Sequence, residues 1–249
     1  MKHKKKKYVY TGILVVMILF GLFLSSNTKL GYMMTIRLHG YTEIKANVYL
    51  DKNYSGDYQV IQELLEEATE RVTNFWGTLE SKPVIILSES NDKLKRLGYS
   101  ASPFTSMYLF HGARTYMIFS TNDMDVDLLA HEMTHAELYG RAYKDKWYNS
   151  SLIPIWFNEG VAMQNDYRDK YNDSAWEKVT NNGTIVKSLN AIASIQNFYT
   201  DDSKVNYIIS RHELHDWISK NGMAALIDLI QRVNKGEEFH ELYDSYLGA

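Results

Sequence analysis

Two histidines four residues apart, His131 and His135, are the residues whose types and spacing best fit chemistry. They lie in the run His-Glu-Met-Thr-His, within a stretch (126–141) whose apolar periodicity predicts a helix. Residues i and i+4 share one face of a helix, so both imidazoles can reach one ion. Glu132 lies one step round, where it can accept a proton from a water without binding the ion. The chain has no Cys, so a metal must be held by His and carboxylate groups.

A third ligand is needed, because two His residues leave zinc under-coordinated and a catalytic site keeps one position open for water. One known zinc-enzyme pattern places a His six residues after the second His and a Gly three residues after it. Here those positions hold Arg141 and Leu138, which excludes that pattern. Glu159, in the run WFNEGVA (156–162), is the better candidate, on a second predicted helix that opens near Pro154.

The combination of HEMTH with the later WFNEGVA resembles the gluzincin metallopeptidases, specifically the peptidase MA-like family related to the M1 aminopeptidases. The resemblance covers roughly residues 80–249. It implies that one zinc ion is held by His131, His135 and Glu159, with Glu132 as the general base. It also implies an α+β, thermolysin-like peptidase domain with a mixed-sheet lobe and a helical C-terminal lobe.

The same resemblance implies roles for two further residues. Asp166 follows Glu159 by seven residues, which is two turns along the same predicted helix, and resembles the acidic residue of M1-type enzymes that supports a ligand His from behind. Tyr207 precedes Gly222 by fifteen residues and resembles the tyrosine that donates to the oxyanion in those enzymes. We therefore expect Glu132 and Tyr207 to be the catalytic residues.

The chain also departs from the M1 pattern. The gap between His135 and Glu159 is longer, and the strand element Gly-Ala-Met-Glu-Asn, which captures a free amine in M1 enzymes, corresponds here to 112–116, GARTY, with no Glu. We therefore predict a zinc metallopeptidase that cleaves within peptides. The alternative is a non-catalytic, extracellular zinc-binding module that retains the fold. His212 and His215 suggest a second metal site, but no carboxylate pattern completes it.

The elements that must position these residues alternate up to about residue 141. We expect a strand over 43–50, a helix over 58–77, a strand over 82–90, a short helix over 91–98 and two strands within 107–120 that meet at His111 and Gly112. The predicted buried side of helix 58–77 consists of Val60, Leu64, Ala68, Val72 and Phe75. From about residue 153 the chain reads as helical to its end.

The N-terminal segment predicts a membrane anchor. Five lysines precede the uncharged apolar run 8–24, which at 1.5 Å per residue spans roughly 26 Å of a ~30 Å hydrocarbon core. The basic start places the amino end in the cytoplasm and the domain outside the cell membrane in a single-pass arrangement. A cleaved signal peptide is the alternative, and it makes the enzyme a secreted one. We therefore divide the chain into residues 1–26, the anchor, and 27–249, the metallopeptidase domain, with 25–40 as a tether.

The net charge of the chain indicates which classes of partner it can bind. The net charge is −3 although the first 26 residues hold five lysines and no acid, so the rest of the chain is more acidic than that figure. An acidic body disfavours nucleic acid as a partner. The predicted partners are a peptide or protein substrate and, through the N-terminal helix, the membrane. The sequence does not set an oligomeric state.

Overall fold

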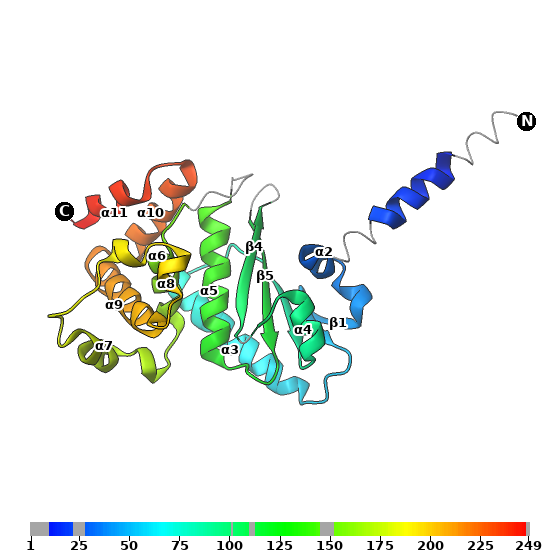
Figure 1. The fold of residues 1–249 in the computed structure, drawn as a ribbon, viewed down its shortest axis with the longest axis horizontal. Helices are drawn as coiled ribbons and strands as arrows, with labels where there is room; N and C mark the ends of the chain where they lie inside the picture. The colour runs from blue at the N-terminus through cyan, green and yellow to red at the C-terminus, as the bar shows by residue number, and fades with distance from the viewer. Residues whose placement is uncertain (1–9, 22–27, 101, 110–112, 145–151, 248–249) are drawn as a thin grey trace, which may run out of the picture. The chain divides into compact units, whose positions relative to one another are not determined.

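The computed structural model describes residues 10–21, 28–100, 102–109, 113–144 and 152–247, and its contacts divide the chain into two compact units. The first unit takes in residues 1–55, 85–102 and 118–123, and the second takes in 56–84, 103–117 and 124–249. Most of the described chain is helical (Figure 1). Every residue predicted above to do chemistry belongs to the second unit.

The described strands form one five-stranded sheet in the order β1-β2-β3-β5-β4. Its strands are β1 (Tyr41–Lys45), β2 (Val48–Asp51), β3 (Val84–Ser88), β4 (Phe104–Leu109) and β5 (Ala113–Ser120). Strands β1 and β2 are antiparallel, with Tyr41 opposite Asp51, whereas β2 and β3 are parallel, with Val48 opposite Ile85. The single strand expected over 43–50 is thus a hairpin, turned at Asn47, whose φ is 64°.

Short helices complete the first unit: α2 (Lys29–Met34), the 3₁₀ turn η1 (Ile36–His39) and α4 (Asn91–Leu97). Thr28 caps α2 by accepting a hydrogen bond from the Gly31 amide, and the Tyr32 and Met33 side chains are buried. The segment that we described as a tether thus contains a helix and a 3₁₀ turn from residue 29 to residue 39. Periodicity did not reveal α2, because a helix this short takes its stability from packing.

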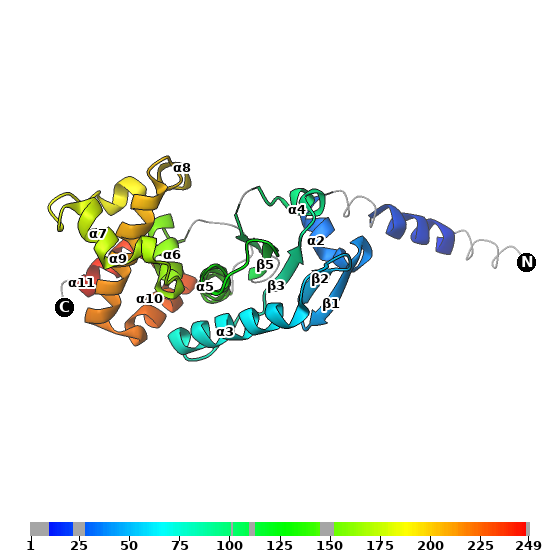
Figure 2. The same ribbon diagram turned by 90° about the horizontal axis from the view of Figure 1, so that it is seen from below.

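Helices make up most of the second unit, and two of them, α5 and α6, carry the candidate metal ligands. Figure 2 views α5 end-on, with α6 and α10 beside it. The helices and 3₁₀ turns of this unit are α3 (Tyr58–Trp76), α5 (Val126–Ala142), α6 (Ile155–Ala162), η2 (Met163–Asn165), η3 (Asp169–Tyr171), α7 (Asp173–Thr180), η4 (Leu189–Ile192), α8 (Ile195–Phe198), α9 (Ser203–Asn221), α10 (Met223–Lys235) and α11 (Phe239–Leu247).

Aromatic packing supports α6 from the C-terminal helices. Trp156 and Phe157 of α6 contact Phe239 and Tyr243 of α11 edge-on, with ring centroids 4.8–6.3 Å apart. The ring of Trp217, in α9, stacks on Tyr243 at 5.6 Å. Large aromatic side chains bury much area each, so this cluster stabilises the position of α6.

The buried side of α3 differs from the predicted one. Ile61, Leu65 and Trp76 are buried together with Ala68 and Val72, while Val60 is half exposed. The predicted stripe is thus displaced by one residue at several positions. Either stripe satisfies helical periodicity, and packing against α5 favours the one that buries the larger Trp76.

Two larger expectations are wrong. The predicted α+β, thermolysin-like fold with a mixed-sheet lobe is contradicted by a chain that is mostly helical with a small sheet. The transmembrane helix over 8–24 is contradicted as well. Within the described residues, no helix is both long and apolar enough to cross a bilayer. The predicted location as a single-pass protein of the cell membrane depended on this helix and is therefore contradicted too.

A close approach between α6 and α9 depends on Gly160, directly after Glu159. A Cβ at this position would lie 2.6 Å from the Ser210 carbonyl oxygen and 2.8 Å from Leu214 Cδ2, both in α9. A backbone oxygen cannot turn aside as a side chain can. Gly160 therefore permits the packing that places Glu159 in the interior.

We predict that Gly160→Ala destabilises the protein by about 1–3 kcal/mol, because overpacking must push α6 away from α9. Urea denaturation measures the loss. Gly12→Ala is the matched helical control, since a Cβ there meets nothing within 4 Å. Equal stability of the Gly160→Ala variant and the wild type would contradict this account of the packing.

Candidate metal centre

Helix α5 presents His131, Glu132 and His135 from a firmly held position. Asp125 caps the helix by accepting a hydrogen bond from the Leu128 amide at 2.7 Å. The side chains of Leu129, Ala136 and other α5 residues are fully buried, so tertiary packing fixes the rotation of the helix. The two histidines and Glu132 are themselves buried, with at most 6% of each residue exposed.

Glu159 reaches the same place from α6. This helix begins directly after Pro154, and its residues from Trp156 to Ala162 are buried. A carboxylate in such surroundings requires a compensating partner, because an isolated charge is costly away from water. The two imidazoles of α5 lie within 3.4 Å of this carboxylate and can supply the positive charge.

Three side-chain atoms converge at this point. His131 Nε2 and His135 Nε2 are 3.1 Å apart, and Glu159 Oε2 lies 3.4 Å from the first and 3.3 Å from the second. Neighbouring ligands of a tetrahedral zinc ion with bonds of 2.0–2.1 Å are separated by about 3.3 Å. Among the described residues, this trio is the only group of three or more His, Asp or Glu side chains whose ligand atoms lie close enough together to hold a metal ion.

The carboxylate oxygen that faces the two histidines has no hydrogen-bond partner among the described residues, so it can accept a cation. Glu159 Oε2 is buried and accepts no hydrogen bond in the part of the chain that the structure describes. Buried polar atoms are seldom left in that condition. The convergence of two imidazole nitrogens and one carboxylate oxygen therefore fits a metal ion such as zinc.

Asn158 orients one of the histidines. Its Oδ1 lies 3.0 Å from His135 Nδ1, and its Nδ2 donates to the Tyr139 hydroxyl at 2.8 Å. Since the amide nitrogen is committed to Tyr139, the amide oxygen accepts from Nδ1, which leaves Nε2 as the unprotonated nitrogen of the neutral ring. The Tyr139 ring lies nearly parallel to His135, at 6.0 Å. The sequence analysis did not single out Asn158 or Tyr139.

Thr105, in β4, binds the residue expected to act as the base. Its hydroxyl lies 2.7 Å from Glu132 Oε2 and 3.0 Å from the Glu132 carbonyl oxygen. A hydroxyl has one proton to donate, and the carboxylate oxygen is the closer and stronger acceptor. This contact fixes one oxygen of the Glu132 carboxylate, and no local sequence signal connects the two residues.

Tyr199 binds the third candidate ligand. Its hydroxyl donates to Glu159 Oε1 at 2.5 Å, on the carboxylate oxygen that does not face the histidines. Tyr199 is one of nineteen tyrosines and follows a helix of only four residues, so sequence reasoning had no means to select it.

Asp166 lies near His131, but it is not on the helix that the sequence analysis predicted for it. Helix α6 ends at Ala162, and Asp166 follows η2 in an extended conformation, so the prediction that it continues the helix is wrong. Its Oδ2 is nevertheless 3.7 Å from His131 Nδ1. Arg168 occupies the carboxylate through both Nε and Nη2. Asp166 is therefore near His131 without a hydrogen bond to it.

Tyr207, in α9, lies beside His131, with ring centroids 6.3 Å apart. Burial and the charges of Glu159 and Glu132 raise the pKa of Tyr207, so its phenol stays protonated and can donate a hydrogen bond at neutral pH. It packs against Met163, Tyr171 and Ile208. The structure thus places Tyr207 in the neighbourhood of the candidate ligands.

The other histidines noted in the sequence lie elsewhere or outside the description. His212 stacks on Trp176 at 3.7 Å and faces Asp216, and His215 is exposed. No metal-ligand group within the described residues includes either of them. His111 lies outside the described residues.

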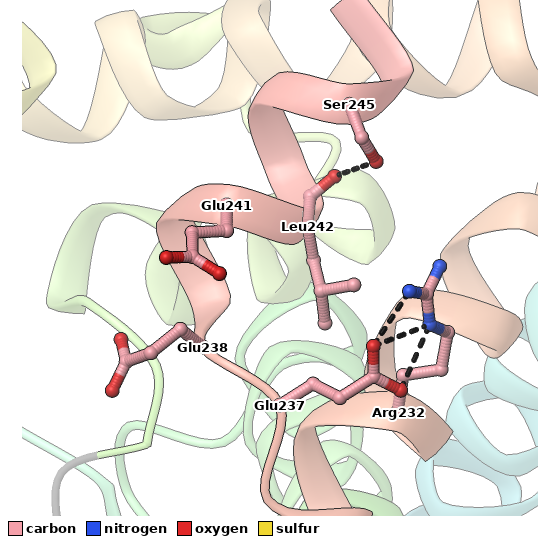
Figure 3. Close-up of a pocket in the computed structure, with 6 residues that line it drawn as sticks. All are labelled: Arg232, Glu237, Glu238, Glu241, Leu242 and Ser245. Carbon is pink, nitrogen blue, oxygen red and sulfur yellow. Dashed lines mark hydrogen bonds and ion pairs between the residues drawn. The ribbon is translucent and has the colours of Figure 1, made fainter.

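A depression of about 230 Å³ at α10 and α11 contains none of the candidate ligands (Figure 3). Its lining residues are Arg232, Glu237, Glu238, Glu241, Leu242 and Ser245. Both oxygens of Glu237 accept from Arg232 Nε, and one also accepts from Nη2, so the Arg232 guanidinium is paired with a carboxylate. We assign this depression no part in the chemistry.

The electrostatics of the metal-free trio favour a bound proton. Burial disfavours a charged His135, but the neighbouring Glu159, with smaller contributions from Glu132 and Asn158, outweighs this and raises the pKa of His135 to about 9. Burial likewise opposes ionisation of Glu159, yet the two histidines hold the pKa of its carboxyl far below its ordinary value. The site thus attracts positive charge, which a proton supplies when no metal is bound.

Comparison with known proteins gives one informative match. Aminopeptidase N from Homo sapiens is 27% identical to this chain over 133 residues, which cover 51% of this chain and 13% of that protein. No family model matches the chain. This chain is therefore similar to a short part of a much longer peptidase.

We predict that the metal-free protein loses stability as the pH rises from 6.5 to 9.5. A raised His135 pKa contributes stability that is complete below the unfolded value of 6.5 and is lost as the pH passes through about 9. The free energy of unfolding should fall by up to about 3 kcal/mol, as measured by urea denaturation with chelator present. His135→Asn is the control and should lack this part of the fall. Identical pH slopes for the two proteins would show that His135 does not hold the proton.

Proposed function

We propose that this chain is a zinc-dependent metallopeptidase that hydrolyses peptide bonds with a water nucleophile. The observation that carries the proposal is the convergence of His131 Nε2, His135 Nε2 and Glu159 Oε2 at separations of 3.1–3.4 Å, next to Glu132 on the same helix. The partial match to aminopeptidase N supports a peptidase. The HEMTH and WFNEGVA runs support the more specific proposal of gluzincin type.

The proposed ligands are His131, His135 and Glu159, and they fit one zinc ion by donor type, burial and spacing. When bound, zinc supplies Lewis acidity, which lowers the pKa of a water to about 7 and polarises a carbonyl group. Asn158 holds His135, and Tyr199 holds Glu159, in the orientations seen here.

The chain's own groups move the protons. Glu132 accepts the proton of the attacking water and passes it to the leaving amine. Because Thr105 holds Oε2 of this carboxylate, Oε1 is the oxygen assigned to the proton. Tyr207 is proposed to donate a hydrogen bond to the oxyanion of the tetrahedral intermediate. Asp166 is assigned a supporting role behind His131, with Arg168 keeping it ionised.

Cleavage within peptides is the proposed mode of action. Among the described contacts, three carboxylates lie at the site, and each is engaged: Glu132 with Thr105, Glu159 with Tyr199, and Asp166 with Arg168. Because each of these carboxylates already has a part in the proposed metal site, none of them is assigned to a substrate's free amine. Aminopeptidase action is the second candidate function, because the human protein that matches part of this chain is an aminopeptidase.

Matched peptides with free and acetylated amino ends separate these two modes. An endopeptidase cleaves both at internal bonds, at similar rates. Release of single residues from the free amino end, with no cleavage of the acetylated peptide, would support the aminopeptidase instead.

We predict that Glu132→Gln retains one zinc ion per chain and the wild-type melting temperature but abolishes peptide hydrolysis. The amide keeps the shape of the side chain and cannot accept the proton. Zinc is measured by elemental analysis, and hydrolysis by mass spectrometry of a peptide library. Hydrolysis by the variant at the wild-type rate would reject Glu132 as the base. Absence of hydrolysis by both proteins, with zinc bound, would favour the non-catalytic zinc-binding module.

We predict that Tyr207→Phe lowers kcat by about 10²–10³, since loss of one oxyanion donor costs about 2.7–4 kcal/mol. KM should change little, because the hydrogen bond strengthens mainly in the transition state. Steady-state kinetics with a cleaved peptide measures both. A tyrosine that only packs against Met163 and Tyr171 would leave kcat nearly unchanged, and retention of more than about a third of it would move the oxyanion role to another group.

A further inference from the structure

We propose that Tyr199 is a positioning residue for the metal ligand Glu159, and that its hydroxyl keeps this carboxylate bound to zinc through Oε2 alone. The inference rests on the proposed zinc site. The two oxygens of Glu159 have different surroundings: Oε1 accepts the Tyr199 hydroxyl at 2.5 Å, whereas Oε2 faces the two histidines. A carboxylate whose second oxygen is occupied in this way is presented to an ion as a one-oxygen ligand.

The backbone around Tyr199 is built to hold the hydroxyl at this place. Ser194 caps the short helix α8, and the carbonyl oxygen of Phe198 accepts a hydrogen bond from Asn206 Nδ2 at 2.7 Å. Phe198 and Asn206 are both completely buried. The residue directly before Tyr199 is thus anchored to α9 by its ring and by its carbonyl group.

Burial of the ring does not explain the position of Tyr199. The residue is 48% exposed, although its hydroxyl points inward to Glu159. A tyrosine selected for core packing has the opposite arrangement, with a buried ring and a hydroxyl that reaches toward water. The inward hydroxyl therefore points to a role at the carboxylate.

Tyr207 is the natural comparison, because it is a second tyrosine at the same site. The rings of Tyr199 and Tyr207 are 6.4 Å apart and the two side chains interact, but only the Tyr199 hydroxyl binds Glu159 among the described hydrogen bonds. The same substitution at the two positions should thus affect different properties. Tyr199→Phe removes the partner of the ligand, whereas Tyr207→Phe leaves that contact in place.

We predict that Tyr199→Phe raises the zinc dissociation constant 10–100-fold, the range for loss of a group that orients a metal ligand. Tyr207→Phe should change it less than about threefold. Competition with a chromophoric chelator measures both constants on the full chain, without reference to activity. An unchanged dissociation constant in Tyr199→Phe overturns the inference, while failure of the wild type to bind zinc overturns the proposed function instead.

A double-mutant cycle tests whether Tyr199 acts through Glu159. In a Glu159→Ala background the tyrosine has no carboxylate to orient, so adding Tyr199→Phe should not weaken the residual zinc binding further. An undiminished effect of Tyr199→Phe in that background would show that the tyrosine acts by another route.

Cobalt in place of zinc gives a spectroscopic test of the one-oxygen binding. Without the Tyr199 hydroxyl, Glu159 is free to bind through both oxygens, which raises the coordination number and weakens the visible d–d absorption. Tyr199→Phe should show this weakening, and Tyr207→Phe should keep the wild-type spectrum. Identical spectra of all three proteins would contradict the proposed role.

Discussion

The structure of the site depends on one buried carboxylate, Glu159, that faces two imidazoles. Glu159 is 3% exposed, and a charge in such a place is stable only when other groups compensate it. The histidines do so in the metal-free state, where burial lowers the pKa of His135 but the charge of Glu159 outweighs burial and raises it to about 9. A divalent cation satisfies the same requirement more fully, since it attracts all three groups at once.

The surrounding elements restrict how these groups can turn. Gly160 permits the close packing of α6 on α9, and the aromatic cluster of α6 and α11 supports the helix from the other direction. Around the ligands, Asn158, Thr105 and Tyr199 each bind one atom of a functional side chain. Asn158 binds Nδ1 of His135, whose Nε2 faces His131, and Tyr199 binds Oε1 of Glu159, whose Oε2 faces the two histidines. The site is therefore preorganised by hydrogen bonds that come from three separate segments of the chain.

The parts of the site that could be predicted from sequence are those fixed by local geometry. The spacing of His131 and His135 places them on one helix face wherever that helix packs, and Asp125 marks its start. Glu159 could be predicted because a carboxylate in an apolar run requires a partner. Tyr199 and Thr105 could not, because their contacts join segments 27–40 residues apart, and such contacts leave no periodic signal.

The errors have physical causes of the same kind. Asp166 was placed on a continuous helix, but the chain leaves α6 at Ala162, and Asn165 instead binds the Thr134 hydroxyl of α5 at 2.8 Å. This tertiary contact overrides helical periodicity. The α+β prediction gave the strands too much weight, since many of the helices that dominate the chain, such as α7 and α8, are too short to show a clear repeat.

The central claim is that these three side chains bind one metal ion. Anomalous diffraction at the zinc absorption edge, from crystals grown with stoichiometric zinc, tests it directly because the peak locates the ion independently of activity. The account predicts a single peak within about 2.0–2.2 Å of His131 Nε2, His135 Nε2 and Glu159 Oε2. A zinc peak bound by other residues, with His131, His135 and Glu159 still in contact with one another as they are here, would contradict it.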